Sequence, residues 1–70
     1  MSGRRISVVI PSYNEEESLD QLHAELVRAA DEGKLDLIEI LFIDDGSKDG
    51  TWSKIRSLAE KDQRVKGIRF

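Results

Sequence analysis

ILFIDDGSKDGTW, residues 40–52, joins the end of an apolar run to a polar turn and the start of a helical pattern. The run from Leu35 to Ile43 is nearly continuous in apolar residues. Alternation places these residues on both faces, with Leu37, Leu41 and Ile43 on one and Ile38, Ile40 and Phe42 on the other. A strand that is apolar on both faces is typical of the centre of a parallel sheet.

Helical spacing follows the turn from Asp44 to Gly50. Trp52 and Ile55 recur with Leu58 and Ala59 on one helical face, so we expect a helix from about Thr51 to Lys61, with Trp52 in the core. Beyond it, Val65 to Phe70 has the composition of a third strand.

The residues before the central stretch predict a strand followed by a helix. The β-branched run Ile6 to Ile10 predicts the strand. Asn14 with Glu17 three residues later resembles a capping box, so we expect a helix from about Glu15 to Asp31, with Gly33 as its stop.

These elements predict an α/β fold in β-α-β-α-β order, with a three-stranded parallel sheet of strand order 3-2-1. We expect residues 1–5 to form a tail and residues 6–70 to form the N-terminal part of a larger domain, truncated at its C-terminus. Right-handed crossovers place both helices on one face of the sheet. The other face then lacks a cover within these residues, and we expect it to be covered by later helices or to support self-association.

Composition excludes several classes of protein. The 70 residues contain no Cys, which excludes disulfides and thiolate metal sites. The net charge of -3 makes a nucleic-acid binder an unfavourable interpretation, although residues 51–70 are locally basic. No apolar run is long enough to span a bilayer and none resembles an export signal, so we expect a cytoplasmic location.

Candidate chemistry lies in the two loops that follow the first two strands, because ligands of open parallel sheets bind at the carboxyl ends of strands. The first loop, Pro11 to Glu15, lacks the glycines of a dinucleotide site, and no P-loop is present. Its carboxylates would repel phosphate but accept hydrogen bonds from ribose or base, and Tyr13 offers a ring for stacking. Glu16 and Glu17 are explained more simply by favourable charge at a helix start.

Asp44 and Asp45 end the central strand. Adjacent carboxylates repel each other, and alternation sends them in opposite directions. We expect Asp45 to enter the site and Asp44 to brace the loop, while an Asx turn remains an alternative for both. Gly46 and Gly50 fit left-handed turn positions, and Ser47 or Asp49 is expected to cap the second helix.

Other sites are disfavoured by single positions. A calcium loop starting at Asp45 would place Arg56 where a bidentate Glu is required, and an Asp-x-Asp-Gly-Thr phosphatase motif would need Asp at Ser47. A phosphoacceptor receiver domain carries its acidic pair after the first strand, so it remains a weak third interpretation. His23 has no second His or Cys near it and is expected to be packed or solvated rather than a metal ligand.

ISVVIPSYNEEESL (residues 6–19) followed by ILFIDDGSKDGTW resembles the start of family 2 glycosyltransferases of the GT-A fold, most closely the polyprenyl-phosphate sugar transferases of the dolichol-phosphate mannosyltransferase type. The resemblance covers Ile6 to Phe70. It implies that Pro11, Tyr13 and Glu15 line the nucleotide pocket, and that Ile43 and Asp45 contact the base and ribose.

The resemblance also implies what these residues lack. The Asp-x-Asp metal motif and the catalytic base of the family lie after later strands, so no catalytic or metal-binding residue is expected here. The whole enzyme would use Mg²⁺ or Mn²⁺ to transfer a sugar from a UDP- or GDP-sugar to a polyprenyl phosphate at the cytoplasmic face of a membrane. Alone, residues 1–70 would recognise the nucleoside without catalysis. The alternative is a non-catalytic module that binds nucleotide or dimerises.

Overall fold

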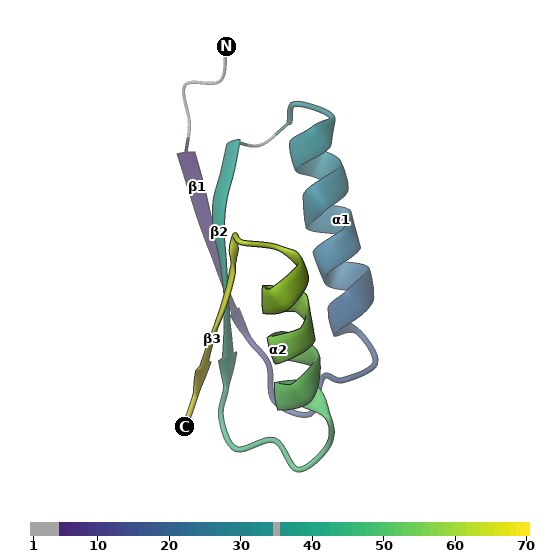
Figure 1. Ribbon diagram of the computed structural model, residues 1–70, viewed down its shortest axis with the longest axis vertical. Coiled ribbons are helices and arrows are strands. Elements are labelled where there is room, and N and C mark those ends of the chain that lie inside the picture. The colour runs from purple at the N-terminus through teal and green to yellow at the C-terminus, as the bar shows by residue number, and fades with distance from the viewer. Residues whose placement is uncertain (1–4, 35) are drawn as a thin grey trace.

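The computed structural model describes residues 5–34 and 36–70, so most of the predicted tail and Leu35 lie outside the described residues. Its elements are β1 (Arg5–Pro11), α1 (Leu19–Asp31), β2 (Asp36–Asp44), α2 (Thr51–Lys61) and β3 (Val65–Arg69). The three strands form a parallel sheet in the order β1-β2-β3, with both helices on one side of it (Figure 1). The predicted α/β class, the topology and the bounds of α2 are confirmed.

The core lies between the sheet and the two helices. Its buried side chains come from every element except β1: Leu19, Leu37, Ile40, Phe42, Ile55, Leu58 and Val65. Trp52 packs against this cluster and is partly buried, as expected. Gly67 brings β3 close to α2, because a Cβ there would lie 2.6 Å from Ile55 Cγ2. The absence of a side chain at this position therefore permits the observed helix–sheet distance.

A register irregularity corrects the predicted alternation of β2. Ile6 pairs with Leu37 but Ser7 pairs with Glu39, so Ile38 is the extra residue of a bulge. The bulge turns Leu37 to the face of Ile40 and Phe42, where it is buried, and leaves Ile38 exposed. The prediction that Leu37 shares a face with Leu41 was wrong because strict alternation does not hold across a bulge.

The second face of the sheet has no helix over it in the described part of the chain (Figure 1). Val9 of β1 is 57% exposed and pairs with the half-buried Leu41. Ile43 pairs with Pro11 on one side and with the exposed Ile68 on the other. We call this surface the open face. The exposure of its apolar side chains confirms the prediction that one face of the sheet is left uncovered within residues 5–34 and 36–70.

The start of α1 corrects a second expectation. α1 begins at Leu19 rather than near Glu15, and its cap position, Ser18, makes no side-chain cap hydrogen bond. The capping box does not form, because Asn14 has a left-handed φ of 51° and its side chain bonds to another loop. The end of α1 follows the prediction: Gly33, at φ 78°, donates to Ala30 O, and the next amide reaches Ala29 O, as in a Schellman motif.

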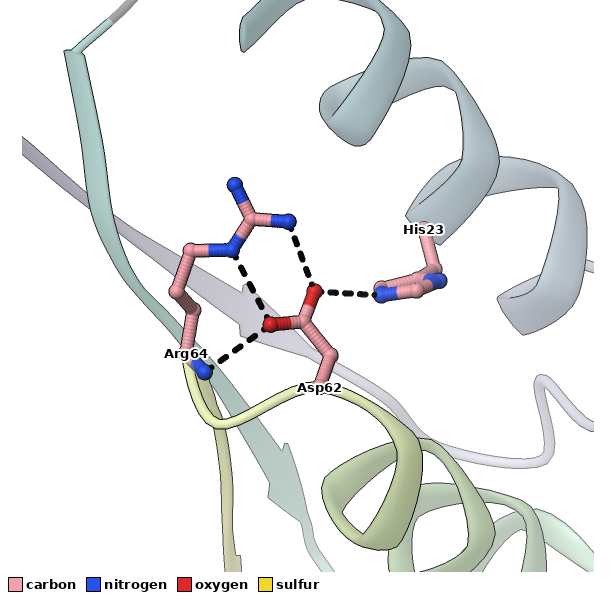
Figure 2. A network of polar contacts seen from close by, with 3 residues as sticks. All are labelled: His23, Asp62 and Arg64. Atoms are coloured by element: carbon pink, nitrogen blue, oxygen red, sulfur yellow. Dashed lines mark hydrogen bonds and ion pairs between the residues drawn. The ribbon is translucent and has the colours of Figure 1, made fainter. Parts of the chain in front are cut away.

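Polar contacts to Asp62 connect α1 with the end of α2 (Figure 2). Asp62 accepts two hydrogen bonds from the guanidinium of Arg64, at 3.0 Å each, and its Oδ2 lies 2.9 Å from His23 Nε2 of α1. The guanidinium of Arg64 holds the pKa of Asp62 well below its usual range, and the amide of Arg64 and the His23 ring lower this pKa further. His23 is therefore packed in a structural role, as predicted. No helix within the described residues is long and apolar enough to cross a membrane.

Candidate functional site

The two candidate loops lie side by side at the carboxyl end of the sheet, at the lower end of Figure 1. Pairing of β1 with β2 ends at Pro11 and Ile43, and the amide of Ser12 then donates to Ile43 O at 2.7 Å. The backbone of the first loop therefore contacts the end of β2, just before the second loop begins. This arrangement agrees with the position expected for a ligand site in an open parallel sheet.

Hydroxyl groups of the second loop and of α2 bind successive amides of the first loop. The amide of Asn14 donates to Ser47 Oγ at 2.8 Å, and that of Glu15 donates to Thr51 Oγ1 at 2.9 Å. Ser47 Oγ donates in turn to Ser12 O at 3.1 Å. In the other direction, the amide of Lys48 donates to Asn14 Oδ1 at 3.0 Å. We call these four hydrogen bonds the loop clasp.

Carboxylates next to the loop clasp accept hydrogen bonds from the amides at the start of α2. The amide of Gly50 donates to Glu16 Oε1 at 2.9 Å, and the amide of Thr51 donates to Asp49 Oδ1 at 2.9 Å. Asp49 also accepts the hydroxyl of Thr51, and this bond holds the pKa of Asp49 below its usual value. The prediction that Ser47 or Asp49 caps the second helix was wrong: the cap position is Gly50, whose φ of -82° is not left-handed as expected, and no side chain makes a cap hydrogen bond there. Of the helical amides Asp49 binds only the first, and Ser47 binds the first loop instead. Glu16 has the structural role expected of it, but at α2 rather than α1.

The acidic pair divides between two environments. Asp44 is fully buried, and its Oδ1 accepts the amide of Ser47 at 2.8 Å. Its Oδ2 has no hydrogen-bond partner among the described residues. Asp45 is exposed. Asp44 therefore braces the loop as predicted, and the Asx-turn alternative applies to it, while Asp45 is free to meet a ligand.

The five predicted nucleotide-binding residues fall into three groups. Pro11 and Ile43 are register partners on the open face, at the ends of neighbouring strands. Tyr13, which is 53% exposed, and Asp45 each follow one of these partners by two residues. Glu15 differs, because its carboxylate accepts the hydroxyl of Ser18 at 2.8 Å. It lines a shallow polar depression beside α1, together with Glu16, Glu17, Gln21 and Asp49. The structure thus brings Pro11 and Ile43 together and directs Glu15 toward the start of α1.

Sequence reasoning missed the residues that hold the loops in place. Asn14 was interpreted as a helix cap, and Ser47 and Thr51 were interpreted as parts of a local turn or helix start. All three bind across loops that are more than thirty residues apart in sequence. The sequence does show that hydroxyl and amide side chains are concentrated where the strands end. No local pattern, however, identifies the residues that they bind.

The metal expected for the whole enzyme does not fit these residues. No group of three or more His, Cys, Asp or Glu side chains among residues 5–34 and 36–70 is arranged to hold a metal ion. Asp44 Oδ1 accepts the amide of Ser47 and only the buried Oδ2 is unpaired, while Asp49 accepts the amide and the hydroxyl of Thr51.

Comparison with known sequences identifies relatives over nearly the whole chain. The profile of the family described as glycosyl transferase family 2 matches residues 7–70. A prophage bactoprenol glucosyl transferase homolog of Escherichia coli and a bactoprenol glucosyl transferase of a Shigella phage are each 44% identical over 66 residues, which is 94% of this chain and 21% of theirs. An undecaprenyl-phosphate 4-deoxy-4-formamido-L-arabinose transferase of Shewanella sediminis is 46% identical over 65 residues, which is 90% of this chain and 19% of its own. The chain spans about a fifth of the length of these relatives.

Proposed function

The chain belongs to glycosyl transferase family 2, and we propose that it forms the nucleoside-recognising part of an enzyme that transfers a sugar from a nucleotide-sugar donor to a polyprenyl phosphate. The family match and the α/β topology support the transferase class. The polyprenyl acceptor is inferred from the relatives, whose names specify bactoprenol or undecaprenyl phosphate.

The observation that carries the proposal is the arrangement at the carboxyl end of the sheet. Pro11 and Ile43 are neighbouring apolar residues on the open face, and the exposed Tyr13 and Asp45 each follow one of them by two residues. A nucleoside needs such a combination, because its base has an apolar surface while its ribose hydroxyls and base N–H groups are donors. In this proposal the ring of Tyr13 packs against the base, and the Asp45 carboxylate accepts hydrogen bonds from the ribose or base. Glu15 lines the far side of the first loop.

The remaining chemistry is assigned to the rest of the enzyme. We propose that a divalent metal, Mg²⁺ or Mn²⁺, and the base that activates the acceptor are held by parts of the protein outside residues 1–70. When bound, the metal would neutralise charge on the leaving diphosphate. We also propose that the enzyme works at the cytoplasmic face of a membrane, where a polyprenyl phosphate is accessible. Residues 1–70 alone should have no transferase activity.

Titration of the ¹⁵N-labelled chain with UDP and GDP in the presence of Mg²⁺ tests the proposal. We expect amide shift changes confined to Tyr13–Glu15 and Ile43–Gly46, larger for one nucleotide, which would identify the base of the donor. Adenosine diphosphate and free inorganic phosphate serve as controls. Shift changes confined instead to the surface depression on α1 lined by His23, Val27 and Arg28, or the same weak changes with every nucleotide, would contradict nucleoside recognition by these loops.

The open face supports a second candidate, a non-catalytic module that dimerises. Val9, Ile68 and Phe70 expose large apolar side chains on this face or at its end, with Phe70 76% exposed. Such a surface favours association of two copies in the isolated chain. Sedimentation at increasing protein concentration measures this association. A chain that stays monomeric and gives no nucleotide response would contradict both candidates.

A further inference from the structure

We propose that Ser47 is a positioning residue, which holds the first loop so that Tyr13 is presented to the nucleoside. The inference rests on the proposed function for its ligand, but its structural part is independent of it. Ser47 is itself unavailable to a ligand. It is buried, and its hydroxyl both accepts from the Asn14 amide and donates to Ser12 O.

The residue that Ser47 holds has an unusual backbone conformation. Among the non-glycine residues that the structure describes, Asn14 alone has a positive φ, 51°. Asn adopts this left-handed conformation more readily than most residues, but the conformation still costs free energy. Its amide bonds to Ser47 Oγ, and its side chain accepts the next amide of the second loop, that of Lys48. Hydrogen bonds from the second loop therefore stabilise the conformation of Asn14 from both sides.

Asn14 lies between two candidate ligand residues. Because Tyr13 precedes it and Glu15 follows it, its dihedral angles set the direction in which the chain carries both side chains. Glu15 is fixed further by its amide, which donates to Thr51 Oγ1. A change in Asn14 from the left-handed to an extended conformation would redirect the Tyr13 ring relative to Pro11 and Ile43. Positioning of Tyr13 is thus a consequence of contacts made by a loop that begins more than thirty residues later.

Ser47 is held in turn by a buried carboxylate. Its amide donates to Asp44 Oδ1 at 2.8 Å, and Asp44 sits at the end of the central strand without exposure. Asp44 therefore fixes Ser47 to the end of the sheet, and the hydroxyl of Ser47 fixes the first loop. This connection explains why an Asp pair ends β2: Asp44 orders the loops and leaves Asp45 exposed.

The test compares the unmodified chain with Ser47→Ala, Ser47→Thr and a matched control, Ser53→Ala, which truncates an exposed serine of α2. Hydrogen exchange of the Asn14 amide gives a readout without nucleotide, and titration with UDP and GDP gives the affinity. In Ser47→Ala we expect the Asn14 amide to lose its protection and nucleotide affinity to fall about tenfold. Ser47→Thr should restore much of both, because it keeps the hydroxyl, and Ser53→Ala should change neither.

A second variant guards against simple unfolding of Ser47→Ala. Asn14→Ala is an exposed substitution that penalises the left-handed conformation without touching the core, and it should reproduce the loss of affinity. Affinity within twofold of the unmodified chain in folded Ser47→Ala, or unchanged protection of the Asn14 amide, would overturn the proposal. If the unmodified chain binds neither nucleotide, the proposed function fails for this chain. Amide protection and the Tyr13 ring shifts then decide the positioning role by themselves.

Discussion

The two faces of the sheet differ although the same three strands form them. On the covered face, Leu37, Ile40 and Phe42 of β2 are buried under α1 and α2. On the open face, Leu41 and Ile43 of the same strand are only half-buried, and their neighbours Val9 and Ile68 are exposed. Stability should therefore come mainly from one face, while the other is available for contacts with a ligand, a second copy or further protein.

The largest expected difference compares adjacent residues of β2. Phe42→Ala removes a fully buried ring and should cost about 3–5 kcal/mol, out of a total stability of roughly 3.5–10 kcal/mol for a chain of this size. Leu41→Ala, at a half-buried position on the open face, should cost about 1 kcal/mol. Urea denaturation followed by circular dichroism measures both. Equal costs for the two substitutions would mean that the open face is covered in solution.

The candidate site at the border of the open face gives the next effect. Asp45→Asn replaces a carboxylate acceptor by an amide at an exposed position, so nucleotide affinity should fall about tenfold while the melting temperature stays the same. Asp31→Asn, an exposed change at the end of α1, is the matched control and should leave affinity unchanged. Equal affinity of the Asp45→Asn and unmodified chains would remove Asp45 from the site.

Ion pairs on the two sides of the sheet should also differ in how much they contribute to stability. The pKa of Asp62 is lowered in the fold, chiefly by Arg64, so its contribution to stability is present above the unfolded pKa of about 3.9 and is lost as pH falls below it. Asp62→Asn should therefore reduce stability by about 1 kcal/mol at pH 7 and flatten its acid dependence. The Glu39–Lys66 pair on the open face is more exposed, and Glu39→Gln should change stability by under about 0.5 kcal/mol.

Thermal unfolding of both variants between pH 2 and pH 7 checks this difference. The relevant comparison is the slope of stability against pH below pH 4. An unchanged slope in Asp62→Asn would contradict a role for the Asp62–Arg64 pair in acid stability.

The smallest stability effect is expected at Ile68, which pairs with Ile43 on the open face. Ile68→Thr keeps β-branching but makes the surface less apolar, so unfolding should change by under about 0.5 kcal/mol. Self-association and binding of a hydrophobic dye should both decrease. Sedimentation and dye fluorescence measure these quantities. No decrease in either would contradict self-association through this face.

Most of the fold was predictable because its signals are local. The helical spacing from Trp52 to Ala59 and the positive-φ glycine after α1 each depend on residues within a few positions of one another. The start of α1 was not predictable in this way. Asn14 and Glu17 match a capping box, but the amides of Asn14 and Glu15 bind hydroxyls of the second loop and of α2. The bulge at Ile38 was missed for a related reason, since register depends on the partner strand.

Only part of the arrangement of the candidate site was predictable from the sequence. Strand topology and the family resemblance placed it at the carboxyl ends of β1 and β2, and the structure brings Pro11 and Ile43 together there. Strand alternation predicted that Asp44 and Asp45 point in opposite directions, and the structure has Asp44 buried and Asp45 exposed. The direction of Glu15, toward Ser18, depends on side-chain contacts that sequence spacing does not encode.

The loop clasp has a consequence for the order of folding. Its hydrogen bonds join residues 33 to 36 positions apart, so they can form only after a long segment has closed. Pairing of β1 with β2 closes nearly the same length of chain, from Pro11 to Ile43, and it brings the two loops to one edge of the sheet, so we expect the clasp to form after this pairing. Weakening the clasp should then accelerate unfolding and leave the folding rate nearly unchanged, so the nucleoside-facing loops would be the last part of the chain to become ordered and the first to open.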